Sequence, residues 1–165
     1  MGALRGVSIF AAQIATALGA KVIATSSKDE NLQAVKKLGA VAGVNYRTHP
    51  EWAEDVLKLT DGRGVDLLLN VAGGDGINQS IAATKAGGRI AQIGFLTGQT
   101  SALNLMPMIF RQTNFRGIAV APRSSFDRMN VFLNEHKIRP VIDHVYPSSR
   151  LARPTNTWPE EHLAK

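Results

Sequence analysis

Short apolar segments typical of buried strands alternate with amphipathic helices along most of this chain. Strands are predicted at residues 21–25, 41–45, 65–71, 89–95 and 115–120, and helices at residues 7–18, 27–38, 50–59, 77–85, 106–112 and 124–137. The run VDLLLNV at residues 65–71 is almost continuously apolar, as expected of a strand that is covered on both faces. Alternation of this kind predicts an α/β fold, a parallel sheet with right-handed crossovers.

The predicted helix at residues 27–38 begins with a capping signature. Ser27 stands three residues before Glu30, the spacing of a capping box. We expect the Ser27 hydroxyl to cap this helix and the Glu30 carboxylate to return the hydrogen bond.

Composition limits the classes of protein that need to be considered. The 165 residues are 44% hydrophobic, which suffices for one domain with a core. The net charge of +6 favours anionic partners, but the Lys and Arg residues are scattered and no recognition motif accompanies them. We therefore expect a phosphate-bearing small molecule rather than a nucleic acid.

The absence of cysteine excludes disulfides, thiolate metal sites and a cysteine nucleophile, and it fits a reducing compartment, so a cytoplasmic location is predicted. No apolar stretch is long enough to span a bilayer, and no membrane association is expected. Gln13 and Thr16 interrupt the apolar run near the start, which favours a helix over a signal peptide.

The titratable residues do not form a recognisable catalytic or metal-binding pattern. The four histidines lack zinc-ligand spacing, so no metal site is predicted. Asp143 and His144 resemble an acid–base pair, but neighbours in a strand point to opposite faces. No catalytic residue is predicted within this chain.

The turns that follow the predicted strands carry the candidate binding residues, because ligands of open parallel sheets bind at the carboxyl ends of the strands. The segment TSSK offers the hydroxyls of Ser26 and Ser27 and the ammonium of Lys28, which suit a phosphate monoester. Tyr46 and Arg47 suit an adenine ring and a phosphate. The alternative is that these residues simply form turns, as they do in many loops.

Several segments in order resemble the cofactor domain of medium-chain dehydrogenases/reductases, especially the NADP-using members that are quinone-reductase-like or alcohol-dehydrogenase-like. They are GVSIFAAQIATALGAKVIATSSKDE, LGAVAGVNYRT, LTDGRGVD, AGGRIAQIGFL and RGIAV, within residues 6–147. The resemblance implies a Rossmann-type doubly wound parallel sheet with strand order 3-2-1-4-5-6 and hydride transfer at nicotinamide.

The resemblance also assigns roles to particular residues. It implies that NADP is preferred over NADH, and that family members dimerise through an edge strand that here runs between Gly117 and Val120. The implied contacts are Gly6, Val7 and Ser8 to the pyrophosphate; Ser26, Ser27 and Lys28 to the 2′-phosphate; Tyr46 to the adenosine; and Val71, Ala72, Gly73, Ile93, Gly94 and Phe95 toward the nicotinamide.

The chain departs from the family pattern at both ends. The family's first turn reads like GTGGVS after a strand, whereas here it reads ALRGVS, with Arg5 in a glycine position and no preceding strand. Without that central strand, the two halves of the sheet close up, another chain fills the gap, or the domain is unstable. The catalytic domain, with any zinc ligands, has no counterpart. We expect a cofactor domain at residues 1–147 and an irregular tail at residues 148–165, ending in a short helix.

These observations predict an NADP(H)-dependent oxidoreductase acting on a carbonyl, alcohol or enone-type substrate, present as its cofactor-binding domain, without zinc and inactive in isolation. The alternative is a non-catalytic nucleotide-binding or interaction module. A Rossmann-like methyltransferase is disfavoured, because its cofactor usually requires an acidic residue where this chain has TSSK.

Overall fold

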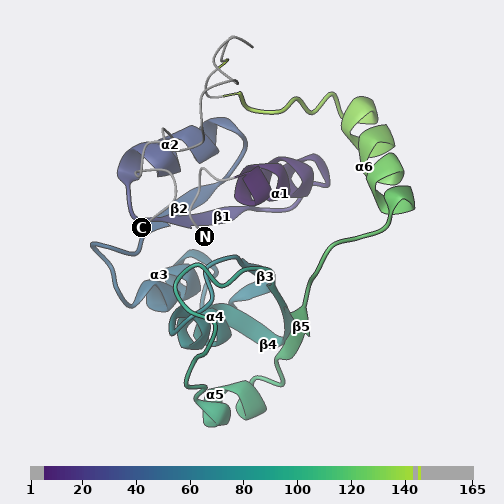
Figure 1. The fold of residues 1–165 in the computed structure, drawn as a ribbon. Helices are drawn as coiled ribbons and strands as arrows, with labels where there is room; N and C mark the ends of the chain where they lie inside the picture. Colours follow the sequence, from purple (N-terminus) through teal and green to yellow (C-terminus); the bar gives the residue numbers. More distant parts are fainter. Residues whose placement is uncertain (1–5, 143–144, 146–165) are drawn as a thin grey trace, which may run out of the picture.

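The computed structural model describes residues 6–142 and 145. Helices and strands alternate along the chain, as the sequence predicts (Figure 1). The helices are α1 (Gly6–Ala17), α2 (Asp29–Lys37), α3 (Trp52–Leu59), α4 (Gly76–Ala83), α5 (Leu105–Phe110) and α6 (Arg123–Glu135). The strands are β1 (Ile23–Ser26), β2 (Ala42–Asn45), β3 (Val65–Asn70), β4 (Thr84–Gln92) and β5 (Asn114–Gly117).

All strand pairs are parallel, but the ladder is divided into two sheets. One has the order β1-β2 and the other has the order β3-β4-β5. Ser26 pairs with Asn45 in the first sheet, and Gln92 pairs with both Asn70 and Gly117 in the second. Within the described part of the chain, β1 and β3 do not pair with each other. Of the three alternatives that the sequence left open, direct pairing of the two halves is therefore not observed.

Helices hold the two sheets together where the ladder is interrupted. Val44 of β2 packs with Ala53 and Val56 of α3 and with Ala83 of α4, and Ile23 of β1 and Leu68 of β3 lie against the same cluster. Two further clusters complete the core. One contains Ala12, Val35 and Ala40 on the α1–α2 side, and the other contains Ile77, Ile81 and Ile90 between α4 and β4.

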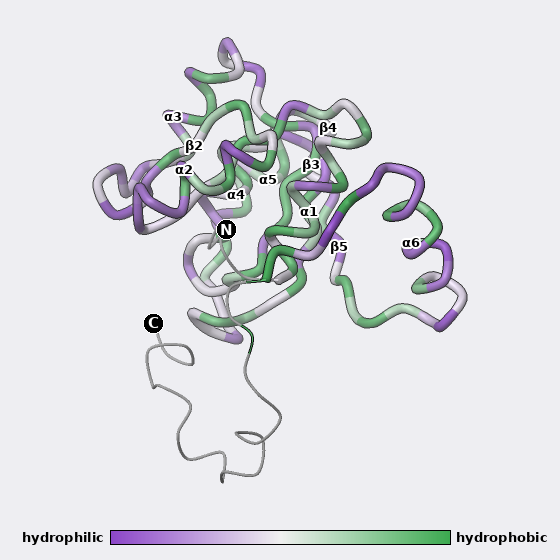
Figure 2. The backbone as a smooth tube through the Cα atoms, turned by 90° about the horizontal axis from the view of Figure 1, so that it is seen from above, coloured by the Kyte–Doolittle hydropathy of each residue, from purple (hydrophilic) through white to green (hydrophobic). Residues whose placement is uncertain are grey.

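The prediction that the strand at residues 65–71 is covered on both faces is wrong. Leu68 packs against α4, but its neighbour Leu67 points to the opposite face and is 48% exposed. Helix α6, which has no buried residue, is set apart from the sheets in two perpendicular views (Figures 1 and 2).

Several element boundaries differ from the prediction, most of all those of β4 and β5. Strand β4 begins at Thr84, which is also the C-cap residue of α4: its hydroxyl donates to Ser80 O at 2.7 Å, and the residue pairs with Val65 of β3. Gly87 then takes a positive φ of 67°, and the register shifts before Arg89. Strand β5 ends at Gly117, so the predicted strand does not extend to Val120.

The predicted capping box is also wrong. Helix α2 begins at Asp29, its N-cap residue is Lys28, and no side chain caps it. The residues of the predicted tail, the pair Asp143 and His144, and the turn residues before Gly6 lie outside the described part of the chain. None of the helices in residues 6–142 has the length and apolar character needed to cross a membrane.

Candidate functional site

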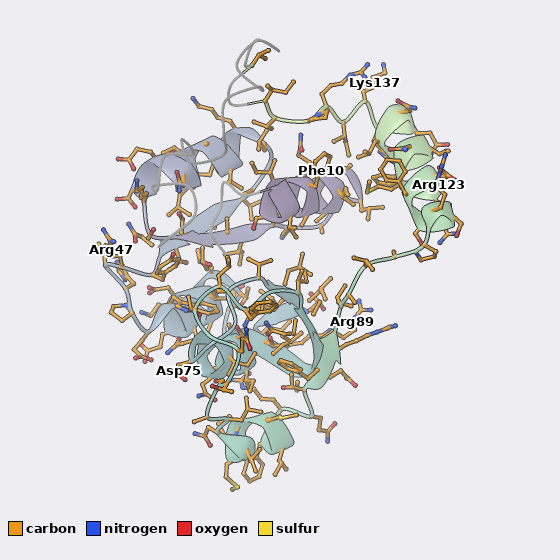
Figure 3. The ribbon with its side chains drawn as sticks, viewed as in Figure 1. Phe10, Arg47, Asp75, Arg89, Arg123 and Lys137 are labelled. Atoms are coloured by element: carbon orange, nitrogen blue, oxygen red, sulfur yellow. The ribbon has the colours of Figure 1, made fainter. Side chains whose placement is uncertain are left out.

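The predicted binding residues follow the carboxyl ends of the strands. These ends are Ser26, Asn45, Asn70, Gln92 and Gly117. Figure 3 shows Arg47, which follows β2, and Asp75, which follows β3, on the same side of the view, whereas Arg89 within β4 lies on the other side. The loops that follow β2 and β3 therefore have residues on the same side of this view.

At the end of β1, Ser26 is a structural residue. It is 0% exposed, and its hydroxyl accepts hydrogen bonds from the backbone nitrogen of Lys28 at 3.3 Å and from the Asn31 side-chain amide at 3.2 Å. The Lys28 side chain is exposed and Ser27 is half-buried. Of the three residues predicted to hold a phosphate monoester, Ser27 and Lys28 are thus accessible to a ligand, and Ser26 shapes the turn beneath them.

The end of β2 lies beside the end of β1, because the backbone nitrogen of Tyr46 donates to Ser26 O at 3.0 Å. Tyr46 is exposed, as an adenine-stacking residue needs to be. Sequence reasoning missed Asn45, which accepts from the Arg47 nitrogen at 3.0 Å and donates to Asp29 at 2.8 Å. Its position as an Asn that ends a strand was the available signal.

The first turn of α1 contains a buried hydroxyl without a partner. Gly6 and Val7 are exposed, whereas Ser8 is 6% exposed and its Oγ makes no hydrogen bond. A buried hydroxyl without a partner destabilises a fold, and a helix N-terminus attracts anions through its free N–H groups and its dipole. The two features together make the start of α1 a candidate anion site.

A cavity of about 550 Å³ lies at the ends of β4 and β5. Of the residues predicted to approach a flat ring, Gly73, Ile93, Gly94 and Phe95 line it, whereas Val71 and Ala72 do not. Residues that the prediction missed also line it, among them Gln92, Leu103, Phe115, Gly117 and Ile118. Nothing in the local pattern of these residues distinguishes a cavity wall from core, which is why sequence reasoning missed them.

One wall of the cavity is formed by two backbone segments in close contact. Gly73, with φ of 71°, forms a bridge with Gly98, and the Gly74 nitrogen donates to Gly98 O at 3.2 Å. A Cβ at Gly73 would lie 2.8 Å from Gly98 O. Thr97 closes the contact by donating its hydroxyl to Gly73 O at 2.9 Å. Small residues are therefore required here, because two segments of the chain approach each other backbone to backbone.

The histidines of the described residues have structural partners. His49 lies 2.9 Å from Asp55, and the ring of His136 lies 4.2 Å from that of Phe132. Within residues 6–142 and 145, His, Asp and Glu side chains form no group of three that could hold a metal ion.

Comparison with known proteins assigns the chain to a family. The fold is a Rossmann-type α/β domain, and the sequence model of the family described as zinc-binding dehydrogenase matches residues 6–135. The chain belongs to this family, which confirms the resemblance to medium-chain dehydrogenases/reductases.

Among curated relatives, a zinc-type alcohol dehydrogenase-like protein of Schizosaccharomyces pombe is 39% identical over 97% of the chain and 48% of its own length. An acryloyl-coenzyme A reductase of Sulfurisphaera tokodaii is 32% identical over 86% of the chain and 40% of its own length. The chain thus spans about half the length of the first relative and less of the second.

Solved structures show the same fold. A Sinorhizobium meliloti protein classed as an alcohol dehydrogenase superposes with a TM-score of 0.80 and 39% identity, covering 86% of the chain and 41% of that structure. Escherichia coli quinone oxidoreductase in complex with NADPH superposes with a TM-score of 0.73 at 23% identity, covering 87% of the chain and 46% of that structure. The second likeness concerns the fold alone.

Proposed function

We propose that this chain is the cofactor-binding domain of an NADP(H)-dependent oxidoreductase. The observation that carries the proposal is the Ser8 hydroxyl, which is buried in the first turn of α1 without a partner. A pyrophosphate oxygen at this helix N-terminus supplies the missing acceptor and places negative charge at the positive end of the helix dipole. Gly6 and Val7 precede Ser8 and leave the backbone accessible.

The 2′-phosphate of the cofactor fits the turn that follows β1. Ser27 and Lys28 are accessible there, and an ammonium with a nearby hydroxyl suits a phosphate monoester. Ser26, which is buried beneath the turn, presents no carboxylate to repel the phosphate. Tyr46 lies beside this turn and offers an aromatic face to the adenosine.

The nicotinamide fits the cavity at the ends of β4 and β5. Gly73 and Gly94 keep side chains out of its wall, and Phe95, Phe115 and Ile118 supply apolar surface. When bound, nicotinamide supplies reversible hydride transfer. The residues of this chain bind and orient the ring and exclude water from one of its faces.

Other parts of the proposal concern the whole protein. The chain spans about half the length of its first relative, and we propose that the groups acting on a carbonyl, alcohol or enone-type substrate are supplied from outside this chain. We propose that the described residues hold no zinc. The isolated chain is then expected to bind the cofactor without turnover. We also propose a homodimer through the edge that contains Gly117 and Val120, supported by the 99% exposure of Val120. The absence of cysteine supports a cytoplasmic location.

Calorimetric titration of the purified chain with NADPH and NADH, with light scattering in parallel, tests the proposal. We expect NADPH to bind more tightly than NADH, and a mass of twice the monomer. A folded chain that binds neither dinucleotide contradicts the proposed function. A folded chain that binds both equally contradicts the 2′-phosphate site alone. Turnover by the isolated chain contradicts the requirement for groups from elsewhere.

A further inference from the structure

Asn70, the last residue of β3, is a buried polar residue that is 6% exposed. Its side-chain oxygen accepts hydrogen bonds from the backbone nitrogen of Ala72 at 3.0 Å and of Gly73 at 2.9 Å. One side chain therefore holds two successive N–H groups of the turn that forms the glycine wall of the cavity. A buried amide with two such bonds fixes the path of a turn more firmly than backbone preference does.

The backbone of Asn70 acts on the opposite wall. Its carbonyl oxygen accepts from the nitrogen of Ile93 at 2.8 Å and of Gly94 at 3.4 Å. Gly73, Ile93 and Gly94 all line the cavity. Asn70 therefore binds both segments that border the cavity, although it is not itself a lining residue.

The remaining group of the side chain is also engaged. The Asn70 amide nitrogen donates to Ser80 Oγ at 3.3 Å, and Ser80, which is buried on α4, donates to Gly76 O at 3.1 Å. This chain of bonds links the end of β3 to the start of α4. It fixes the rotamer of Asn70, so the side-chain oxygen stays directed at the turn.

We propose that Asn70 is the positioning residue for the nicotinamide end of the cofactor site. It acts through the backbone of Gly73 and Gly94 and contacts no ligand. The inference rests on the proposed function, and it predicts that Asn70 governs affinity for the nicotinamide half of the dinucleotide while leaving affinity for the phosphate half unchanged.

Two substitutions test whether the hydrogen bonds of Asn70 position the turn. Asn70→Leu keeps the number and branching of the side-chain heavy atoms but removes the acceptor and the donor, so the N–H groups of Ala72 and Gly73 lose their partner. Asn70→Asp keeps an acceptor for both N–H groups. Asn134→Leu makes the same chemical change at an exposed position on α6 and serves as the control.

The binding experiment compares NADPH with 2′-phospho-ADP-ribose, which lacks nicotinamide, by calorimetry. We expect Asn70→Leu to weaken the binding of NADPH roughly tenfold, since the nicotinamide end of the site loses its support. The affinity for 2′-phospho-ADP-ribose should stay within about twofold of the wild-type value. Asn70→Asp is expected to keep most of the affinity for NADPH that Asn70→Leu loses. Asn134→Leu is expected to change the affinity for neither ligand.

Amide hydrogen exchange of the ligand-free chain provides a second readout. We expect Asn70→Leu to accelerate exchange at Ala72 and Gly73 but not at Val41, whose nitrogen donates to Val22 O just before the strands of the other sheet. Equal weakening of both ligands, or unchanged exchange at Ala72 and Gly73, overturns the inference while the proposed function stands. A wild-type chain that binds neither ligand overturns both.

Discussion

The side-chain oxygen of Gln79 on α4 accepts a hydrogen bond at 2.9 Å from the backbone nitrogen of Ala53, in the first turn of α3. The Gln79 amide also donates to the carboxylate of Glu51, the N-cap residue of α3. Helix α3 has no side-chain cap of its own. It is therefore capped by a residue 26 positions further along the chain, and the contact joins two helices that cover the point where the sheet is interrupted.

Replacing Gln79 with Ala is expected to lower the free energy of unfolding by about 1 kcal/mol, because the first turn of α3 loses its acceptor. Urea denaturation followed by circular dichroism measures the change. Gln33→Ala is the matched control, since Gln33 is an exposed residue of α2. If the two variants unfold at the same urea concentration, Gln79 does not cap α3.

The alternation of helices and strands was predictable because it depends on local periodicity, and the places of the candidate binding loops followed from it. The roles of Gln79 and Ser26 were not, because each depends on a partner from another element or on burial within the fold. The TSSK segment correctly marked the end of β1, but sequence does not tell which hydroxyl turns inward. The exposure of Leu67 depends on which elements cover its face of β3, and the local pattern does not determine that.

The Ser8 hydroxyl offers a test in which binding and stability move in different directions. Ser8→Ala removes a buried group without a partner, so we expect the free energy of unfolding to stay constant or to rise. Affinity for NADPH is expected to fall roughly tenfold, because the pyrophosphate loses a donor. Calorimetry and urea denaturation on the same preparation measure both quantities.

Ser26→Ala is the matched comparison for Ser8→Ala. The Ser26 hydroxyl has two partners, so its loss should destabilise the chain by about 1 kcal/mol. Loss of stability in Ser8→Ala as large as that in Ser26→Ala would show that Ser8 has a structural role, and it would remove the main support for the pyrophosphate site.

Lys28→Ala should weaken the binding of NADPH roughly tenfold more than the binding of NADH, because only NADPH carries the 2′-phosphate. The side chain is exposed, so the variant should fold like the wild type. Lys36→Ala, at an exposed position on α2, which Lys28 precedes, removes the same charge away from the turn and should leave the ratio of the two affinities unchanged. Titrations at low and moderate salt provide the measurement. Equal weakening of both dinucleotides by Lys28→Ala would exclude a specific 2′-phosphate contact.

Gly94→Ala should force apart two backbone segments at the edge of the cavity, whereas Gly117→Ala should not. A Cβ at Gly94 would overlap the carbonyl oxygen of Val71, and backbone atoms have no rotamer with which to move aside. A Cβ at Gly117 meets nothing within 4 Å, although both glycines line the cavity. We expect Gly94→Ala to lower stability by about 1–3 kcal/mol and to abolish detectable NADPH binding. Thermal unfolding and calorimetry test the pair, and tolerance of Gly94→Ala would mean that the two segments are not in close contact.

Asp66 gives a pH dependence with a defined sign. Hydrogen bonds from Arg63, at 3.0 and 2.8 Å, and from Lys85 lower the pKa of the Asp66 carboxyl well below its usual range. Because the folded pKa is depressed, the stabilisation is present above the ordinary pKa of about 3.9 and is lost as the pH falls through the folded value. Asp66→Asn should therefore be less stable than the wild type at about pH 7, and the difference should shrink below about pH 4.

The carboxylate is exposed, so added salt should reduce the difference in stability as well. Chemical denaturation of both proteins across this pH range gives the result, and a difference that does not vary with pH would mean that the ion pairs contribute nothing to stability.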